Sequence, residues 1–254
     1  MAIEKRQSPK DRAAGEPPPG PQRAPRVPPA LAKVIEVGAR VNQIVPEGVA
    51  LGGAVCALYA EHRLSMDIDF VLQNLRDQFD EVRERLFDVP GWREARIQRP
   101  YLILGSLEEV EIGFRQLRRQ SPIDTQRVET SAGPLTVPIL EEMLAIKAFL
   151  AYDRNAIRDF YDFAELASLL PREAVTNVLL RLDDMMGWER QPAVLLEVIK
   201  ALVLCEPRDL ETHAFETFRF LDPRLKSWDE VKAACQGIGQ LLAARAIQGN
   251  DNAP

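Results

Sequence analysis

Two aspartates separated by one residue, Asp67 and Asp69, are the first side chains of this sequence that could do chemistry together. They lie in the apolar run 66–72, which is typical of a short strand. Side chains two positions apart on a strand point to the same side, so the two carboxylates share space while Ile68 and Phe70 enter the core. Two like charges about 4 Å apart repel by about 1–4 kcal/mol. A divalent cation removes that repulsion, and Mg²⁺ prefers carboxylate oxygens combined with water and phosphate oxygens.

A glycine pair precedes the aspartates. Residues 48–51 are apolar enough for a short strand, Gly52 and Gly53 then form a turn, and residues 54–61 are typical of a short helix. Glycine has no β-carbon, so backbone N–H groups at such a turn can approach phosphate oxygens closely. Alone, an Asp-x-Asp pair is usually a solvated strand edge and a Gly-Gly pair is usually a turn. In this order, they predict a metal and phosphate site.

A second group of charged residues follows on two predicted helices. Lys147 and Arg154 are seven residues apart on a similar side of the first helix, so their charges could reach one anion. Asp159 and Asp162 are three apart on the second helix and could hold either cation in position. Taken alone, this segment also fits a pair of surface helices joined by salt bridges.

Together these residues resemble the signature of the polymerase-β-like nucleotidyltransferase superfamily, and within it the AbiEii/AbiGii-type nucleotidyltransferase toxin family. That family has a Gly-Gly block, an Arg-x-Ser-x-Asp-Ile-Asp block, an Ala-x-Lys on a helix and an Arg-Asp-x-Tyr-Asp block. All four occur here in that order, at 52–53, 63–69, 145–147 and 158–162. The resemblance covers roughly residues 51–166.

The resemblance implies transfer of a nucleoside monophosphate from a nucleoside triphosphate, bound with Mg²⁺ or Mn²⁺, onto an acceptor hydroxyl. It also implies a toxin that a separate antitoxin neutralises, in a toxin–antitoxin or phage-defence pair. The expected catalytic residues are Asp67, Asp69, Lys147, Asp159 and Asp162, and the expected nucleotide-binding residues are Gly52, Gly53, Arg63, Ser65, Lys147 and Arg154.

A third metal-binding carboxylate is expected on a neighbouring strand, because two-metal phosphoryl transfer normally uses one. Residues 109–114 alternate in polarity as a half-buried strand does, with Glu111 on the polar face. Glu111 is therefore expected to complete the metal site with Asp67 and Asp69, and Glu108 and Glu109 are alternatives. If none of the three faces the site, a catalytically weak nucleotide-binding module becomes the better interpretation.

The 254 residues, 46% of them hydrophobic, are enough for one substantial core or two modest ones. The expected fold class is α+β, a polymerase-β-like mixed-sheet core followed by a helical C-terminal domain, with the site in the cleft between them. The expected organisation is a disordered Pro-rich tail at 1–29, a catalytic domain at 30–137, a helical domain at 138–248 and a flexible C-terminus at 249–254.

Composition excludes several classes of protein. No apolar run reaches about 18 residues and no apolar signal region opens the chain, so we expect a cytoplasmic protein without a membrane partner. Cys56, Cys205 and Cys235 are widely spaced among apolar residues, which favours reduced core thiols. His62 and His213 are too isolated for a histidine-based mechanism.

The acceptor is the least determined part of the prediction. RNA, above all the 3′ end of tRNA, is expected, since some members of the resembling family modify it. Six Lys or Arg and three Asp or Glu give the first thirty residues a charge of +3, so the remaining body carries −9. Arginines at 93, 96 and 99, and at 115, 118 and 119, could still steer an RNA backbone. A protein hydroxyl, or a small molecule as in antibiotic nucleotidyltransferases, is the alternative acceptor.

Overall fold

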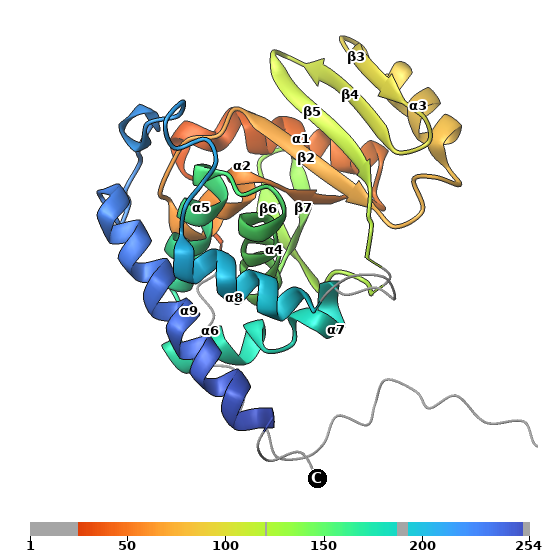
Figure 1. Cartoon of the computed structure of the whole chain (residues 1–254). Helices are drawn as coiled ribbons and strands as arrows, with labels where there is room; N and C mark the ends of the chain where they lie inside the picture. Colours follow the sequence, from red (N-terminus) through yellow and green to blue (C-terminus); the bar gives the residue numbers. More distant parts are fainter. Residues whose placement is uncertain (1–24, 120, 187–192, 251–254) are drawn as a thin grey trace, which may run out of the picture.

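A computed structural model describes residues 25–119, 121–186 and 193–250 (Figure 1), without the side chains of 249 and 250. The expected Pro-rich tail lies outside the described residues as far as residue 24. Residues 25–29 contact the body, because the Arg26 N–H donates to the Leu58 carbonyl at 2.9 Å and Val27 packs against the core. The packed body therefore begins before the expected boundary at residue 29. At the other end, the last helix includes residues 249 and 250, and 251–254 are not described.

A five-stranded mixed sheet forms the N-terminal half, at the top of Figure 1. Its spatial order is β1-β2-β5-β4-β3, with β2 parallel to β5 and the other neighbours antiparallel. In this register Asp67 lies opposite Glu111 and Asp69 lies opposite Gly113. The strands are β1 (Val49–Leu51), β2 (Asp67–Leu72), β3 (Arg93–Gln98), β4 (Leu102–Leu107) and β5 (Val110–Gln116).

One face of the sheet is covered by α1 (Ala32–Ile44). Gly38 lets this helix approach β2 closely, since a β-carbon at Gly38 would lie 2.5 Å from Cδ1 of Ile68. Phe70 of β2 and Phe114 of β5 stack on the same side with ring centroids 5.1 Å apart. Because strand side chains alternate, this packing forces Asp67, Asp69 and Glu111 onto the opposite face.

Shorter elements complete this half. Helix α2 (Gly53–Ala60) joins β1 to β2, α3 (Phe79–Phe87) precedes β3, and β6 (Thr125–Thr130) pairs with β7 (Gly133–Pro138) as a second, two-stranded sheet. The buried Asn42 fixes β7 against α1. Its side chain donates to the carbonyls of Val45 and Gly48 and accepts from the Thr136 N–H at 2.8 Å.

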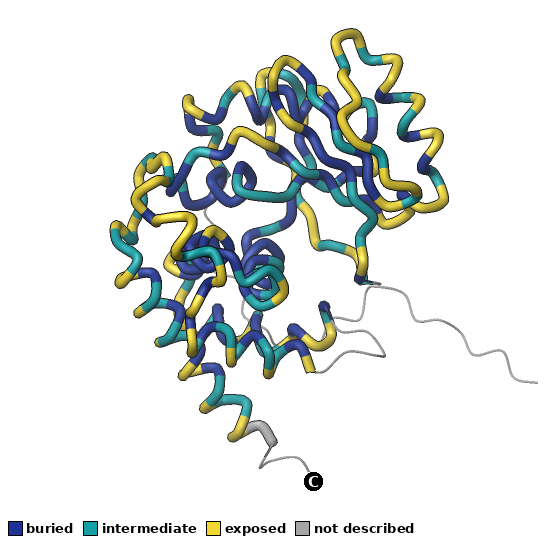
Figure 2. The backbone as a smooth tube through the Cα atoms, turned by 45° about the horizontal axis from the view of Figure 1, so that its top comes forward, coloured by how far each residue is buried: buried dark blue, intermediate teal, exposed yellow. Residues whose placement is uncertain are grey.

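The C-terminal half is helical, so the predicted α+β class is confirmed. Helix α5 lies at its centre, with almost every residue buried (Figure 2). Helix α9 runs along the outer side of this half (Figure 1). The helices are α4 (Leu140–Asp153), α5 (Ile157–Ala167), α6 (Arg172–Leu179), α7 (Leu182–Met186), α8 (Val194–Leu204) and α9 (Trp228–Asn250), with the 3-10 turn η2 (Phe215–Thr217). The other 3-10 turn, η1 (Pro29–Leu31), directly precedes α1.

Residues 205–227 correct the expectation of nearly continuous helix after residue 138, because among them only η2 is helical. We call residues 215–225 the return segment, since they run back to the sheet half. Its backbone pairs with the loop before β2. The Leu64 N–H donates to the Arg219 carbonyl at 2.8 Å, and the Leu221 N–H donates to the His62 carbonyl at 3.0 Å.

The three cysteines, Cys56, Cys205 and Cys235, are free and buried, as expected for core thiols. Among the helices in the described part of the chain, none is long and apolar enough to cross a membrane.

Gly105 of β4 provides a test of the close packing between the outer strands. A β-carbon there would lie 2.3 Å from Cζ2 of Trp92 and 2.8 Å from the Arg93 carbonyl oxygen. We expect Gly105→Ala to lower the free energy of unfolding by about 1–3 kcal/mol, measured by urea denaturation. The control is Gly237→Ala on an open face of α9, where nothing lies within 4 Å and a gain of about 0.5–1 kcal/mol is expected. Equal stability of the two variants would contradict the packing.

Candidate active site

Asp67 and Asp69 lie on the open face of β2, as the alternation predicts. Ile68 and Phe70 between and beyond them are buried, whereas Asp67 is exposed and the Asp69 side chain is 28% exposed. The Ser65 hydroxyl donates to Oδ1 of Asp67 at 2.5 Å, and Nε of Arg115 donates to Oδ1 of Asp69 at 3.2 Å. Each carboxylate therefore has one oriented partner and remains accessible to a ligand.

Gly113 gives Asp69 the space that it occupies. The two residues lie opposite each other on β5 and β2, and a β-carbon at Gly113 would lie 2.2 Å from Oδ1 of Asp69. From the sequence, Gly113 was expected to have no role, and Arg115 was expected only in an RNA-binding cluster. The signal was present, because alternation along β5 puts residues 111, 113 and 115 on the same face as the aspartates.

The glycine turn lies beside the aspartates. Gly52 has φ of 97°, a backbone conformation that favours glycine, and it immediately precedes α2. A β-carbon at Gly53 would lie 2.9 Å from the Ser65 hydroxyl oxygen, so the start of α2 and Ser65 are in close contact. No side chain caps this helix end. The first N–H groups of a helix carry its positive partial charge and suit phosphate oxygens.

The third carboxylate is where the structure departs from the prediction. Glu108 and Glu109 form the turn between β4 and β5, with φ of 51° and 66°, and they pair with Arg40 and Lys33 of α1. Both alternatives are therefore wrong. Glu111 lies opposite Asp67 on β5 and is exposed. Nevertheless, across the described residues no three His, Cys, Asp or Glu side chains are arranged to hold a metal ion together.

Two carboxylates on one accessible strand face still fit Mg²⁺. This ion is commonly bound through one or two carboxylates, with water and substrate phosphates completing its octahedral shell. Asp67 and Asp69 are the residues that would hold it, and the glycine turn adjoins them.

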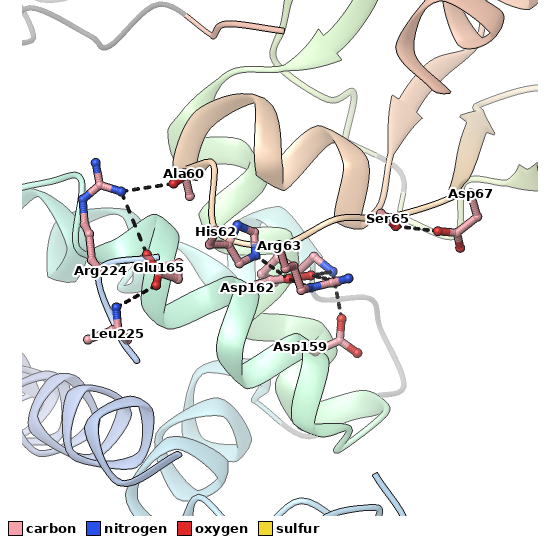
Figure 3. A network of polar contacts seen from close by, with 11 residues as sticks. Ala60, His62, Arg63, Ser65, Asp67, Asp159, Asp162, Glu165, Arg224 and Leu225 are labelled. Atoms are coloured by element: carbon pink, nitrogen blue, oxygen red, sulfur yellow. Dashed lines mark hydrogen bonds and ion pairs between the residues drawn. The ribbon is translucent and has the colours of Figure 1, made fainter. Parts of the chain in front are cut away.

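Behind this face lies a buried cluster centred on Asp162 of α5 (Figure 3). Its carboxylate accepts hydrogen bonds from Nε2 of His62 at 2.8 Å, and from Nε and Nη2 of Arg63 at 2.7 and 2.9 Å. Nζ of Lys147 lies 2.7 Å from Asp162 and 2.9 Å from Asp159. All five side chains are almost completely enclosed.

The charges of this cluster balance. Burial alone would raise the pKa of Asp162, but Arg63 and Lys147 outweigh it and hold that pKa well below its ordinary value. Burial would lower the pKa of Lys147, and the two aspartates instead raise it. Burial also lowers the pKa of His62, so the imidazole is neutral at pH 7. Two cations therefore face two carboxylates.

Lys147 and Arg154 do not face one anion, contrary to the prediction. Lys147 is 3% exposed and is paired with Asp159 and Asp162. These two aspartates were expected to hold either Lys147 or Arg154. Arg154, at the end of α4, lines a cavity instead. The ion pairs between α4 and α5 are buried, so the alternative of surface helices joined by salt bridges is also wrong.

The return segment closes the buried cluster from outside. The guanidinium of Arg63 lies over the ring of Phe218, 5.5 Å from its centroid. Tyr161 of α5 contacts the rings of Phe215, Phe218 and Phe220. This segment was not predicted from the sequence, although three phenylalanines within six residues were a usable signal.

A cavity of about 1150 Å³ opens between the ends of β2 and β5 and helix α4, at the expected junction of sheet and helices. Arg76, Arg115, Arg118 and Arg154 line it, as do Asp77 and Asp153. Arg115 connects the cavity to the aspartates, since the same side chain bonds Asp69.

The model of the family described as nucleotidyl transferase AbiEii toxin, of type IV toxin–antitoxin systems, matches residues 39–234. The chain belongs to the AbiEii nucleotidyltransferase toxin family. The match includes the glycine turn, both aspartates of β2, Lys147 and Asp162.

Solved structures support the same fold. MenT4, a nucleotidyltransferase toxin from Mycobacterium tuberculosis, superposes with a TM-score of 0.53 at 16% identity, covering 84% of this chain and 82% of that one. An antigenic nucleotidyltransferase-like protein from Paracoccidioides brasiliensis gives 0.45 at 16% identity, covering 70% of this AbiEii-family chain and 95% of that one. The first of these shows the likeness of fold.

A curated match is of a different kind. The heme uptake protein MmpL11 of Mycobacterium tuberculosis is 26% identical over 132 residues, which are 51% of this chain and only 13% of that protein. A stretch that short relative to MmpL11 assigns no function to the AbiEii-family chain.

Removing one of the two cations of the buried cluster should make this half of the protein unfold more readily. Lys147→Met leaves Asp159 and Asp162 without their shared ammonium, so we expect a loss of about 3–5 kcal/mol in the free energy of unfolding. The matched control is Lys33→Met, which breaks a solvent-exposed pair with Glu109 and should change stability by less than about 0.5 kcal/mol. Similar losses in urea denaturation would show that Lys147 is not buried in this way.

His62 should make stability depend on pH near neutrality. Its folded-state pKa lies below the unfolded value, so below about pH 6.5 the unfolded chain binds a proton that the folded chain does not. We therefore expect the free energy of unfolding to decrease as the pH is lowered below about 6.5. This group contributes at most about 1.4 kcal/mol of that decrease per pH unit.

The variant His62→Gln keeps an N–H donor and should flatten that part of the curve, measured by urea denaturation between about pH 7.5 and about pH 5, on both sides of the ordinary histidine value. The only other histidine, His213, is exposed, so His213→Gln should leave the curve unchanged. Identical curves for both variants would contradict a neutral buried His62.

Proposed function

We propose that this chain transfers a nucleoside monophosphate from a nucleoside triphosphate onto the hydroxyl of an RNA acceptor, with Mg²⁺ bound by Asp67 and Asp69, as the toxin of a toxin–antitoxin pair. The observation that carries the proposal is the position of the two aspartates. They lie between a glycine turn that suits phosphates and an arginine-lined cavity that suits a polyanion.

In this proposal the chain's own residues bind and orient the substrates. The N–H groups at Gly52 and Gly53 and the start of α2 bind phosphate oxygens, and Ser65 orients Asp67. The acceptor hydroxyl forms a new bond to the α-phosphorus, the bond to pyrophosphate breaks, and a carboxylate of the β2 face accepts the proton. When bound, the metal neutralises charge on the phosphates and polarises them.

Lys147, Arg63, Asp159 and Asp162 act as positioning residues in this mechanism. Their charges are paired with one another in the buried cluster, so these side chains do not contact the nucleotide. They hold the loop that leads to Ser65 and Asp67. Arg154 lies on the acceptor side, in the cavity.

The cavity favours an anionic acceptor. Arg119 also lines the cavity, but its charge is paired with the buried Glu142 at 2.6 Å. The other charged residues of the lining are four arginines and two aspartates. A positively charged small molecule would be repelled by this lining. The other arginine cluster contributes less, because it lies on the edge strand β3 and Arg99 beyond it pairs with Asp80. The similarity in fold to the MenT4 toxin supports the toxin role.

The decisive experiment supplies each α-³²P nucleoside triphosphate with Mg²⁺ to the protein, together with total RNA and total protein. We expect label on RNA, reduced by at least about 100-fold in Asp67→Ala/Asp69→Ala, which corresponds to about 2.7 kcal/mol of transition-state stabilisation. The double variant Asp184→Ala/Asp229→Ala removes two exposed carboxylates elsewhere and should retain full transfer.

Label found only on protein or on a small molecule would show that the acceptor is wrong. Equal transfer by the Asp67→Ala/Asp69→Ala enzyme would show that the site is wrong. Chelation of divalent cations by EDTA should stop transfer by the unmodified chain, and transfer that survives EDTA would exclude the metal-dependent mechanism.

A further inference from the structure

The cavity beside Asp69 contains an aromatic ring for which the transfer mechanism has no use. Tyr101 lies just before β4, lines the cavity and is 45% exposed. Nη2 of Arg76 donates to its hydroxyl at 3.2 Å, and the Arg76 guanidinium lies 5.2 Å from the ring centroid. Arg76 therefore holds the ring at the cavity wall, although neither side chain is needed there for the hydrophobic core.

Another part of the lining is apolar and comes from α4. Ile146, Phe149 and Leu150 line the cavity, on one side of that helix. The volume of about 1150 Å³ is slightly above that of most ligand pockets, which commonly measure about 300–1,000 Å³. An aromatic ring with an arginine on one side, in a cavity that also has an apolar lining, is the surrounding in which proteins stack unpaired bases.

Polar groups suited to a nucleotide occur in the same cavity. The amide side chains of Asn74 and Gln98 line it and could pair with the edge of a base. Within the described part of the chain, Arg118 and Arg154 form no ion pair, so both guanidinium groups are available to phosphates.

The position of the cavity identifies which nucleotide it would take. Gly52, Gly53 and Ser65, which adjoin the start of α2, do not line it, whereas Arg115 does and also bonds Asp69. Leu51, which directly precedes the turn and pairs with Asp69, also lines the cavity, so the glycine turn and the cavity adjoin near Asp69. A donor nucleotide on the glycine side leaves the cavity to the acceptor.

We propose that Tyr101, supported by Arg76, is the stacking platform for the base of the unpaired 3′-terminal nucleotide of the acceptor RNA, with Arg118 and Arg154 binding adjacent phosphates. This inference rests on the proposed function for the chemistry of the acceptor, and it assigns that acceptor a binding subsite.

The test measures binding without transfer. A single-stranded RNA oligonucleotide with 2-aminopurine at its 3′ end is titrated with the full chain in the absence of nucleoside triphosphate, following fluorescence quenching and anisotropy. Stacking on Tyr101 should quench the 2-aminopurine. Since base stacking contributes about 1–3 kcal/mol per base, Tyr101→Leu should abolish the quenching and weaken binding by about 5- to 150-fold.

Two control variants separate stacking from a general loss of structure. Tyr101→Phe retains the ring and loses only the hydroxyl, so it should keep the quenching and bind within about 2-fold, well inside the range lost with a stacking contact. Phe87→Leu changes a large side chain of α3 that is 75% exposed and does not line the cavity, and it should bind normally.

Quenching that persists in Tyr101→Leu would overturn the proposal, as would an unmodified chain that binds no single-stranded RNA. If Tyr101→Leu weakens binding of the nucleoside triphosphate and leaves RNA binding intact, the cavity binds the donor base. That result would also overturn the proposal. RNA that binds and is quenched but receives no label would support the subsite while refuting the proposed transfer.

Discussion

The carboxylate of Asp162 lies where three parts of the chain meet, and its burial makes each of them necessary to the others. The loop before β2 supplies His62 and Arg63, helix α4 supplies Lys147, and α5 carries the aspartate. An enclosed carboxylate without these partners costs several kcal/mol, so the loop cannot move away from α4 and α5 without that penalty. Because the loop leads directly to Ser65 and Asp67, one buried anion fixes the start of the catalytic strand relative to the helical half.

The accessible face of β2 depends on a second constraint, which is steric. Gly38 brings α1 against Ile68 on one side of the sheet, and Gly113 makes room for the Asp69 carboxylate on the other. A larger residue at Gly113 would displace the carboxylate, and one at Gly53 would meet the Ser65 hydroxyl. Small residues therefore let the polar groups of the site approach one another, and the buried side chains behind them prevent the strand from turning over.

Local patterns were sufficient for the strands and the helix around the aspartates, whose bounds match the expectation to within one residue. Alternation along β2 and β5 also identified the face that carries Asp67 and Glu111. The contacts that these patterns did not predict join residues that lie far apart in the sequence. Arg63 and Asp162 are 99 residues apart, and no periodicity shows that Arg63 is enclosed by this ion pair and by Phe218 of the return segment. Glu108 and Glu109 were misplaced because β5 begins at Val110, one residue later than the expected start at 109, and the turn before it directs them toward α1.

The net charge of −6 does not oppose an RNA acceptor, because charges act mainly over short distances. At physiological ionic strength the Debye length is about 8 Å, so a ligand in the cavity responds to the arginines around it more than to carboxylates across the molecule. Among the described arginines that line the cavity, however, Arg118 and Arg154 alone have no side-chain partner, and each phosphate contact with a single strand steepens the salt dependence by only about 0.7. Electrostatics alone would thus give weak binding with a shallow dependence on salt. An acidic protein of this design must hold its acceptor mainly by stacking, which salt does not screen, and Tyr101 is the residue placed to provide it.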